Sequence, residues 1–184
     1  MNFKKNKANY TPLSPVSFLE RTASVFPNYI SVISKEKIFK WSETYNRCVL
    51  LASSLINKKI KIGDVVSIMA PNTHVMYEAH FGIPMAGAII NTINIRLDAK
   101  TISYILSHSK TKLILVDTEF LPTIRQALKI GKLKINIIAI KDEKQFSHNI
   151  QNEQLYENFL LKGKKDFSYM MRIKDEWSPI SLSY

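Results

Sequence analysis

The sequence predicts an α/β protein with a mostly parallel sheet flanked by helices. In the stretch from Gly63 to Asn94, an apolar run over Val65–Met69 is closed by the turn formers Pro71 and Asn72. Apolar residues then recur at helical spacing, and a second apolar run follows. Two buried runs joined by one helix indicate parallel strands, because parallel neighbours need a crossover connection. The same alternation extends over most of the chain, which predicts a sheet with helices on both faces.

The first predicted helix follows two start signals. Ser14 precedes Pro15, a residue favoured in a first helical turn, and Ser17 with Glu20 has the Ser-x-x-Glu spacing of a capping box. The helix is expected to stop at Pro27. Its expected apolar face contains Phe18, Leu19, Thr22, Ala23 and Phe26.

A hairpin and a long helix are expected next. The β-type runs over 30–34 and 38–41 are separated by Lys35–Lys37, which predicts a hairpin turn there. Ser42 is expected to cap the following helix, which ends in a lysine-rich turn before Gly63. Its apolar residues keep the helical period and are Tyr45, Cys48, Val49, Ala52, Leu55 and Ile56.

Helices and strands continue to alternate after residue 94. The expected elements are a helix over 99–107 capped by Asp98, a buried strand over 112–117, a helix over 121–130 stopped by Gly131, and a strand over 135–140. The helix after Asp98 should turn Ile102, Ile105 and Leu106 inward. Beyond residue 140 the pattern weakens to a polar loop over 141–153 and a short helix over 155–161. An apolar and polar alternation near Ile180 indicates the approach to another strand.

Composition narrows the class of protein. The 184 residues, 46% of them hydrophobic, are enough for one domain with a core. No stretch is long and apolar enough to span a bilayer, and the basic N-terminus has no apolar run behind it, so secretion is not expected. A single cysteine, Cys48, excludes an internal disulfide framework, which indicates a reducing compartment.

The net charge of +11 raises the hypothesis of nucleic-acid binding. Most of the 26 basic residues are lysines scattered along the chain. A protein that reads phosphates or grooves usually concentrates its charge and favours arginine for bidentate contacts. The sequence therefore favours no nucleic-acid partner, although a basic binder stays as an alternative.

Residues that could carry chemistry are few. The chain has no glycine-rich phosphate-binding motif, and its histidines lack metal-ligand spacing: His74 and His80 do not share a helical face, while His108 and His148 lie in separate segments. We expect His80 to pack beside Phe81 and the other three histidines to face solvent. No metal ligand is predicted.

Four further side chains have a structural interpretation beside a functional one. Cys48 lies in an apolar helical row, so a buried structural thiol is favoured over a nucleophile. Asp117 ends a strand where open sheets place ligand contacts, but an ordinary turn residue is the favoured interpretation. Asp64 and Asn72 are interpreted as turn residues too. The sequence therefore predicts no catalytic, cofactor-binding or metal-binding residue in this chain.

Several segments, in order, resemble a known family. These are residues 8–15 with 18–21, then 63–66, 70–72, 78–88 and 91–98. With them the chain resembles the N-terminal part of the adenylate-forming acyl-activating enzymes, the acyl-CoA synthetases, and most closely the plant-type branch acting on short-chain or aromatic acids. The resemblance covers about residues 8–120. It implies the incomplete N-terminal region of the adenylate-forming enzyme fold, with residues 1–13 as a flexible arm and residues 14–184 as a partial AMP-binding-type domain.

The resemblance also implies a reaction. Such enzymes activate a carboxylic acid with ATP and Mg²⁺ as an acyl-adenylate and then transfer it to coenzyme A. The residues over 177–184 resemble those just before the family's phosphate loop, so the domain is expected to be truncated before that loop. The matched motifs are scaffold motifs, so none of ATP, Mg²⁺ or coenzyme A is expected to bind this chain alone.

Three functional alternatives follow from the sequence. The first is part of an acid-CoA ligase that is inactive by itself, located in the cytoplasm or the peroxisome. The second is a non-catalytic scaffold or interaction module derived from such an enzyme, and the third is the basic nucleic-acid binder. Truncation is expected to leave sheet edges uncovered, which predicts marginal stability or self-association.

Overall fold

A six-stranded sheet forms the centre of the computed structural model, which describes residues 4, 6, 8–10, 13–141, 150–166, 172–173 and 175–184. Its strands, in sheet order, are β7 (Gln154–Leu155), β6 (Asn136–Ile140), β5 (Leu113–Asp117), β3 (Val65–Met69), β4 (Ile89–Thr92) and β8 (Ser181–Leu182). Every neighbouring pair is parallel. The predicted parallel α/β fold is confirmed.

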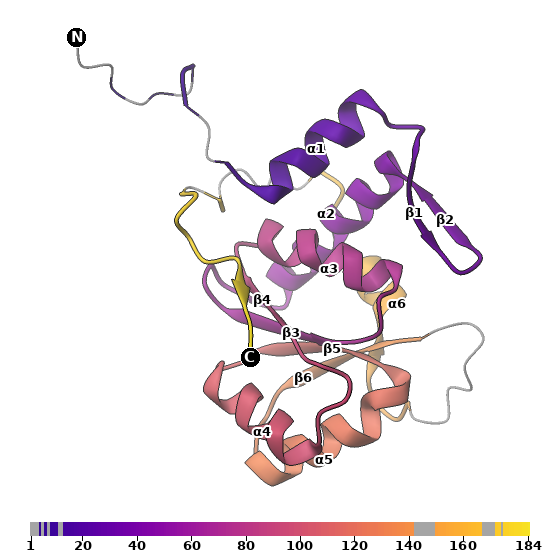
Figure 1. The fold of residues 1–184 in the computed structure, drawn as a ribbon, viewed down its shortest axis with the longest axis vertical. Coiled ribbons are helices and arrows are strands. Elements are labelled where there is room, and N and C mark those ends of the chain that lie inside the picture. Colours follow the sequence, from indigo (N-terminus) through magenta and orange to yellow (C-terminus); the bar gives the residue numbers. More distant parts are fainter. Residues whose placement is uncertain are drawn as a thin grey trace.

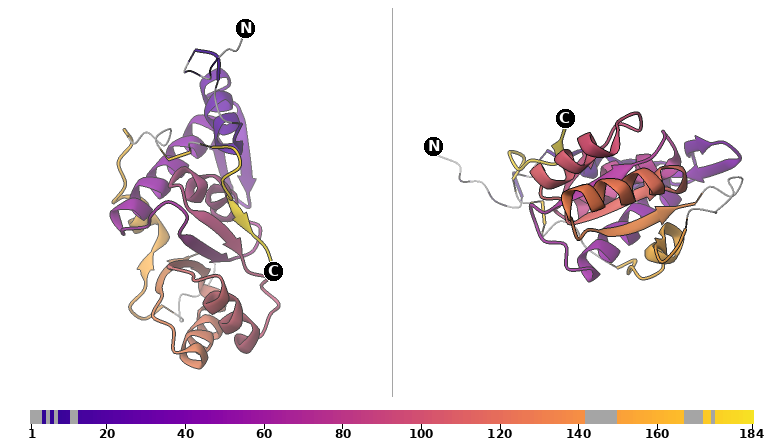
Figure 2. Two further views of the ribbon diagram at one scale, coloured as in Figure 1. Left: turned by 90° about the vertical axis from the view of Figure 1, so that its left-hand side faces the viewer. Right: turned by 90° about the horizontal axis from the view of Figure 1, so that it is seen from below.

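Helices cover both faces of this sheet (Figures 1 and 2). The elements on one face are α1 (Pro15–Val25), α2 (Trp41–Asn57), α3 (His74–Met85) and α6 (Tyr156–Leu160). The other face carries the 3₁₀ helix η1 (Thr118–Phe120) with α4 (Ala99–His108) and α5 (Leu121–Gly131). Alternate residues of each strand enter different cores, as when Ile68 faces α2 and α3 while Met69 faces α4.

The stretch from Gly63 to Asn94 forms β3, α3 and β4, as its periodicity predicts. All five residues of β3 are buried, because both faces of a central parallel strand are covered by helices. Gly82 on α3 lies against α2 so closely that an added Cβ would meet the Leu51 Cδ2 atom at 2.7 Å. Glycine at this position therefore lets α3 pack closely on α2.

The predicted hairpin is also confirmed. β1 (Ile30–Ser34) pairs with β2 (Lys37–Lys40) in an antiparallel ribbon apart from the main sheet. Lys35 turns the chain with a φ of 57°, and Lys37 belongs to the second strand rather than to the turn. The ribbon lies beside α2 and α3 (Figure 1).

Two predicted helix starts are displaced. Ser14 caps α1, whereas Ser17 lies inside the helix and donates to the Ser14 carbonyl, so the predicted capping box of Ser17 and Glu20 is wrong. The second helix begins at Trp41 rather than after Ser42, whose hydroxyl donates to the Pro27 carbonyl. The carboxylate of Glu43 accepts the orphan amide hydrogen of Lys40 and so fixes the earlier start.

The predicted apolar face of α1 is wrong at its edges. Phe18 and Phe26 are 61% and 50% exposed, whereas Val16, which the pattern omitted, is fully buried. Only the side facing α2 and α3 is covered, because no further element packs over this helix among the described residues. The buried stripe is therefore narrower than the sequence pattern.

The two helices on the opposite face match their predicted ranges closely. Asp98 caps α4 through its carboxylate, which accepts from the amides of Lys100 and Thr101, and the predicted inward residues are buried. Gly131 does not stop α5 but is its last residue. Lys132 supplies the left-handed cap instead, with a φ of 50°.

The C-terminal part departs from prediction at one element. The expected helix over 155–161 divides into β7 and α6, because Gln154 and Leu155 pair with β6. The expected terminal strand is confirmed as β8, which pairs with β4. Of the predicted loop over 141–153, residues 142–149 lie outside the described residues, as does much of the predicted arm over 1–13. Over the described ranges, no helix meets the length and hydropathy needed to cross a membrane.

Candidate functional site

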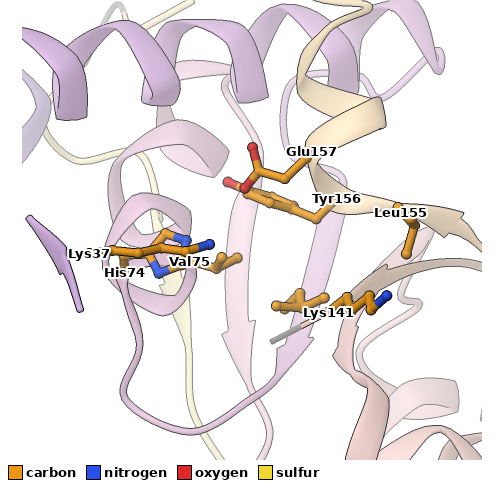
Figure 3. A pocket seen from close by; sticks show the side chains of 8 residues that line it. Lys37, His74, Val75, Lys141, Leu155, Tyr156 and Glu157 are labelled. Atoms are coloured by element: carbon orange, nitrogen blue, oxygen red, sulfur yellow. The ribbon is translucent and has the colours of Figure 1, made fainter. Parts of the chain in front are cut away.

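A hollow of about 240 Å³ lies at the carboxyl edge of the sheet. Open parallel sheets bind ligands at this edge, where strand connections diverge to opposite sides, as they do after β3 and β5. Figure 3 shows Lys37 and His74 on one side of the hollow and Lys141 on the other, with Tyr156 and Glu157 between them. Val75, Ile140 and Leu155 complete the lining.

An ion network borders this hollow, formed by Arg47, Glu78, Tyr156 and Glu157. Arg47 on α2 donates from Nε to Glu78 Oε1 at 2.5 Å and from Nη2 to Oε2 at 3.2 Å. Its Nη1 and Nη2 atoms also donate to the two carboxylate oxygens of Glu157, at 2.9 and 2.7 Å. The Tyr156 hydroxyl donates to Glu78 Oε2 at 2.7 Å. The network thus joins α2, α3 and α6.

Burial sets the electrostatics of the network. Glu78 is 2% exposed, and burial raises its pKa, although hydrogen bonds from Arg47 and Tyr156 favour the ionised carboxylate. Burial and the nearby Glu78 charge raise the pKa of Tyr156 well above its ordinary value. Burial alone would raise the pKa of Glu157 too, but the hydrogen bonds from Arg47 hold it below its ordinary value.

The network is arranged to hold structure together rather than to transfer protons. The proton of Tyr156 is used in its bond to Glu78, and each carboxylate is engaged by Arg47. The guanidinium also lies 5.2 Å from the Phe39 ring centroid, which adds a cation–π contact. A charge pair buried among such partners stays fixed, so it supplies neither a general base nor a nucleophile.

Cys48 is buried beside this network, as its sequence position predicts. Burial and the Glu78 charge raise the pKa of its thiol well above the ordinary value, and its Sγ donates to the Glu78 carbonyl at 3.6 Å. A buried thiol with a raised pKa is a poor nucleophile. The structural interpretation of Cys48 is confirmed.

The histidine predictions are partly wrong. His80, expected to pack beside Phe81, is exposed, while His74, expected in solvent, is partly buried and stacks on Phe39 with ring centroids 5.1 Å apart. The register of α3 explains the exchange, because its buried face passes through Val75 and Ala79. His108 is exposed as expected, and its Nδ1 lies 2.7 Å from the hydroxyl of Tyr184.

No metal centre emerges from the described residues, which contain no group of three or more His, Cys, Asp or Glu side chains suited to hold an ion. His148 lies outside that part of the chain. The sequence-based prediction that no residue of this chain binds a metal or cofactor stays a prediction.

The aspartate and asparagine candidates occupy turns. Asp117 is buried and its carboxylate accepts from the Glu119 amide at 3.0 Å, which starts η1. Asp64 accepts from the Lys61 amide at 2.7 Å. Asn72 is exposed in the bend between β3 and α3. These positions agree with the turn interpretation.

The ion network itself was missed by sequence reasoning. Glu78 stands on the inward face of α3 between Val75 and Ala79, and an acidic residue at an apolar helical position is the signal that could have found it. Its partner Arg47 directly precedes Cys48 on the buried side of α2. The pairing itself comes from the packing of α2 on α3.

Comparison with known proteins extends these observations. The family model described as AMP-binding enzyme matches residues 19–180 of the chain. The chain belongs to this family. The resemblance found in the sequence, to the N-terminal part of acyl-CoA synthetases, is thereby confirmed.

Curated relatives of this chain are named as acid-CoA ligases. The peroxisomal butyrate–CoA ligase AAE11 of Arabidopsis thaliana is 41% identical over 186 residues, which cover 97% of the chain and 32% of the relative. The peroxisomal benzoate–CoA ligase of the same plant is 43% identical over 187 residues, with the same coverages of 97% and 32%. The acetate–CoA ligase CCL3 of Humulus lupulus is 41% identical, covering 98% of the chain and 34% of the relative. The chain spans about a third of the length of the curated relatives it matches.

Solved structures share the fold of this chain at lower identity. The anthranilate CoA ligase AuaEII, in complex with anthranoyl-AMP, superimposes with a TM-score of 0.75 at 20% identity, over 83% of this chain and 29% of that one. Coronafacic acid ligase from Pectobacterium brasiliense superimposes with a TM-score of 0.75 at 18% identity, over 92% of this chain and 33% of the ligase. These likenesses establish that the chain has the fold of part of an adenylate-forming enzyme.

Proposed function

We propose that this chain forms the N-terminal scaffold of an acid-CoA ligase. The whole ligase would activate a carboxylic acid as an acyl-adenylate and transfer the acyl group to coenzyme A. The observation that carries the proposal is the identity of 41–43% to relatives named as butyrate, acetate and benzoate ligases, over nearly all of the chain. Cytoplasm and peroxisome are the proposed locations, the second supported by the peroxisomal relatives.

We also propose that the chain alone does not activate an acid. Its candidate site offers a saturated ion network, and the described residues lack a set of carboxylate and histidine ligands for Mg²⁺. Among the described residues, those of this candidate site do not fit ATP, Mg²⁺ or coenzyme A, so no reaction step is assigned to them. Its own contribution is to hold the carboxyl edge of the sheet rigid, through the network that joins three helices.

Two measurements test this proposal. ATP–pyrophosphate exchange by the purified chain, with acetate, butyrate, benzoate and cinnamate, is expected at background level. A chimera in which residues 1–184 replace the matching third of the Arabidopsis butyrate–CoA ligase is expected to be active, because the relative supplies the remaining two thirds. ATP–pyrophosphate exchange above background by the chain alone would overturn the proposal that it is inactive by itself. A folded but inactive chimera would overturn the scaffold role, with the intact relative as the positive control.

A further inference from the structure

Lysines gather at the edge of the sheet opposite the ion network. β3, β5 and β6 are parallel neighbours, so their amino ends lie side by side (Figure 1). The loops that enter these strands cover residues 58–64, 109–112 and 132–135. They carry seven lysines, here named the lysine rim: Lys58, Lys59, Lys61, Lys110, Lys112, Lys132 and Lys134. Asp64 is the one acidic residue in these loops.

Part of the lysine rim surrounds a hollow of about 310 Å³. Four of its lysines line the hollow, three from the loop before β3 and Lys112 from the loop before β5. Asn136, the first residue of β6, adds an amide. The carboxylate of Asp64 is engaged by the Lys61 amide. Cationic side chains from separate loops thus converge on one concavity, which focuses their positive potential.

The charge of the lysine rim is not compensated within the described structure. Arginines elsewhere form ion pairs, as Arg47 does with Glu78 and Arg125 with Glu153. Among the residues that the structure describes, no rim lysine has an acidic partner within ion-pair distance. Asp64 also lines the hollow, but among the described residues neither its carboxylate nor any other forms an ion pair with a rim lysine, so an anion from outside the chain would meet an excess of cations there.

Backbone geometry adds a second observation. Lys59, Lys110 and Lys132 have φ angles of 68°, 55° and 50°, in the left-handed region, where each ends a helix. Glycine is the usual residue at such helix ends, because a side chain there costs backbone free energy. Lys35 in the hairpin turn shares this conformation. Three neighbouring helix ends thus place lysine in a conformation that glycine would adopt with less strain, and all three ammonium groups belong to the rim.

Compensation of helix dipoles accounts for only part of the lysine rim. Cations stabilise a helix mainly from within its last turn. The last turn of α2 holds no basic residue, while those of α4 and α5 hold His108 and Lys129. Lys58 and Lys132 cap α2 and α5, whereas Lys61, Lys112 and Lys134 lie further along the loops, beyond the helix ends.

We propose that the lysine rim binds clustered phosphate groups, either of a soluble polyphosphate or of phosphorylated lipid headgroups. A lysine ammonium is a flexible point charge that suits several phosphate positions. The hollow has room for one compact phosphate group. The rim lysines outside the hollow would contact a second phosphate group of the same ligand. This binding is independent of the proposed ligase role, because the rim lies at the edge of the sheet away from the carboxyl ends of the strands.

Isothermal titration of the intact chain with tripolyphosphate at low ionic strength tests the proposal. The variant Lys61→Gln/Lys112→Gln, which removes two cations from the hollow, is expected to bind on the order of tenfold more weakly. The control Lys40→Gln/Lys100→Gln removes the same charge at exposed positions elsewhere and should keep the parent affinity. An equal loss in both variants would mean that only net charge matters and would overturn the site.

A second variant separates binding from folding. Lys59→Gly/Lys132→Gly removes two rim charges at positions whose backbone favours glycine, so its thermal transition should be at least as high as that of the parent. Weaker binding by this well-folded variant supports the proposal. Parent affinity in both rim variants would overturn it.

Two further probes distinguish the source of the phosphate. Cosedimentation with phosphatidylcholine vesicles that contain a phosphatidylinositol phosphate, compared with phosphatidylcholine alone, tests the lipid source, and tripolyphosphate tests the soluble one. The proposal is supported if the parent chain binds one of these two probes and the Lys61→Gln/Lys112→Gln variant binds it more weakly. The proposal is overturned if the chain binds neither tripolyphosphate nor the phosphoinositide vesicles. It is also overturned if the same lysines bind a duplex oligonucleotide more tightly than both of these probes, because the surface would then belong to nucleic acid.

Discussion

Arg47 on α2 holds the buried carboxylate of Glu78 on α3 through two hydrogen bonds, of 2.5 and 3.2 Å. The two residues are 31 positions apart in the chain, and their pairing fixes how α2 and α3 pack beside the carboxyl edge of the sheet. Glu157 on α6 binds the other side of the same guanidinium.

The Arg47→Met variant is expected to lose about 3–5 kcal/mol of unfolding free energy, because it leaves the Glu78 carboxylate buried without its cation. Urea unfolding monitored by circular dichroism measures the loss. The double variant Arg47→Met/Glu78→Leu removes both charges and should be more stable than Arg47→Met. If the double variant were less stable than Arg47→Met, the unpaired Glu78 carboxylate would not be the cause of the stability that Arg47→Met loses.

Glu157 should contribute its full stability above its ordinary pKa of 4.5, because its pKa is lowered in the folded state. Its contribution is lost as the pH falls through the folded value, since the protonated carboxyl no longer attracts Arg47. Glu157→Gln should therefore be less stable than the parent at pH 7, by less than about 1 kcal/mol for a half-exposed side chain, and equal to it at acid pH. Unfolding curves across this range measure the difference, and a constant gap would contradict the mechanism.

Gly82→Ala is expected to lower the unfolding free energy by about 1–3 kcal/mol through overpacking. The added methyl group would lie 2.7 Å from Leu51 Cδ2 and 3.0 Å from the Cys48 carbonyl oxygen, and the latter is backbone that cannot rotate away. His80→Ala, at an exposed position of the same helix, serves as the control and should stay within about 0.5 kcal/mol of the parent. Stabilisation by Gly82→Ala would show that helix propensity outweighs the contact.

The chain alone is expected to self-associate. Its edge strands β7 and β8 are two residues long, and large apolar side chains are exposed, with Trp177 at 89% and Leu161 at 79%. Light scattering should give a mass that rises above 21.2 kDa with protein concentration. A concentration-independent monomer with a cooperative thermal transition would be inconsistent with this expectation.

Much of the fold could be predicted from sequence because its signals are local. The apolar run of β3, the cap at Asp98 and the period of α3 each depend on neighbouring residues. The errors arise where a distant element decides. Gln154 and Leu155 form a strand because β6 is beside them, and Phe18 is exposed because it lies away from the side of α1 that packs on α2 and α3.

The sequence by itself determined the α/β alternation, the buried state of Cys48 and membership of the AMP-binding family, since periodicity and motif order are properties of the chain. Only the tertiary structure decided that Arg47 meets Glu78 and that lysines scattered along the sequence share one edge. The physical reason is the parallel sheet. It brings the amino ends of β3, β5 and β6 together, so charges from three separate loops add within one small region of surface.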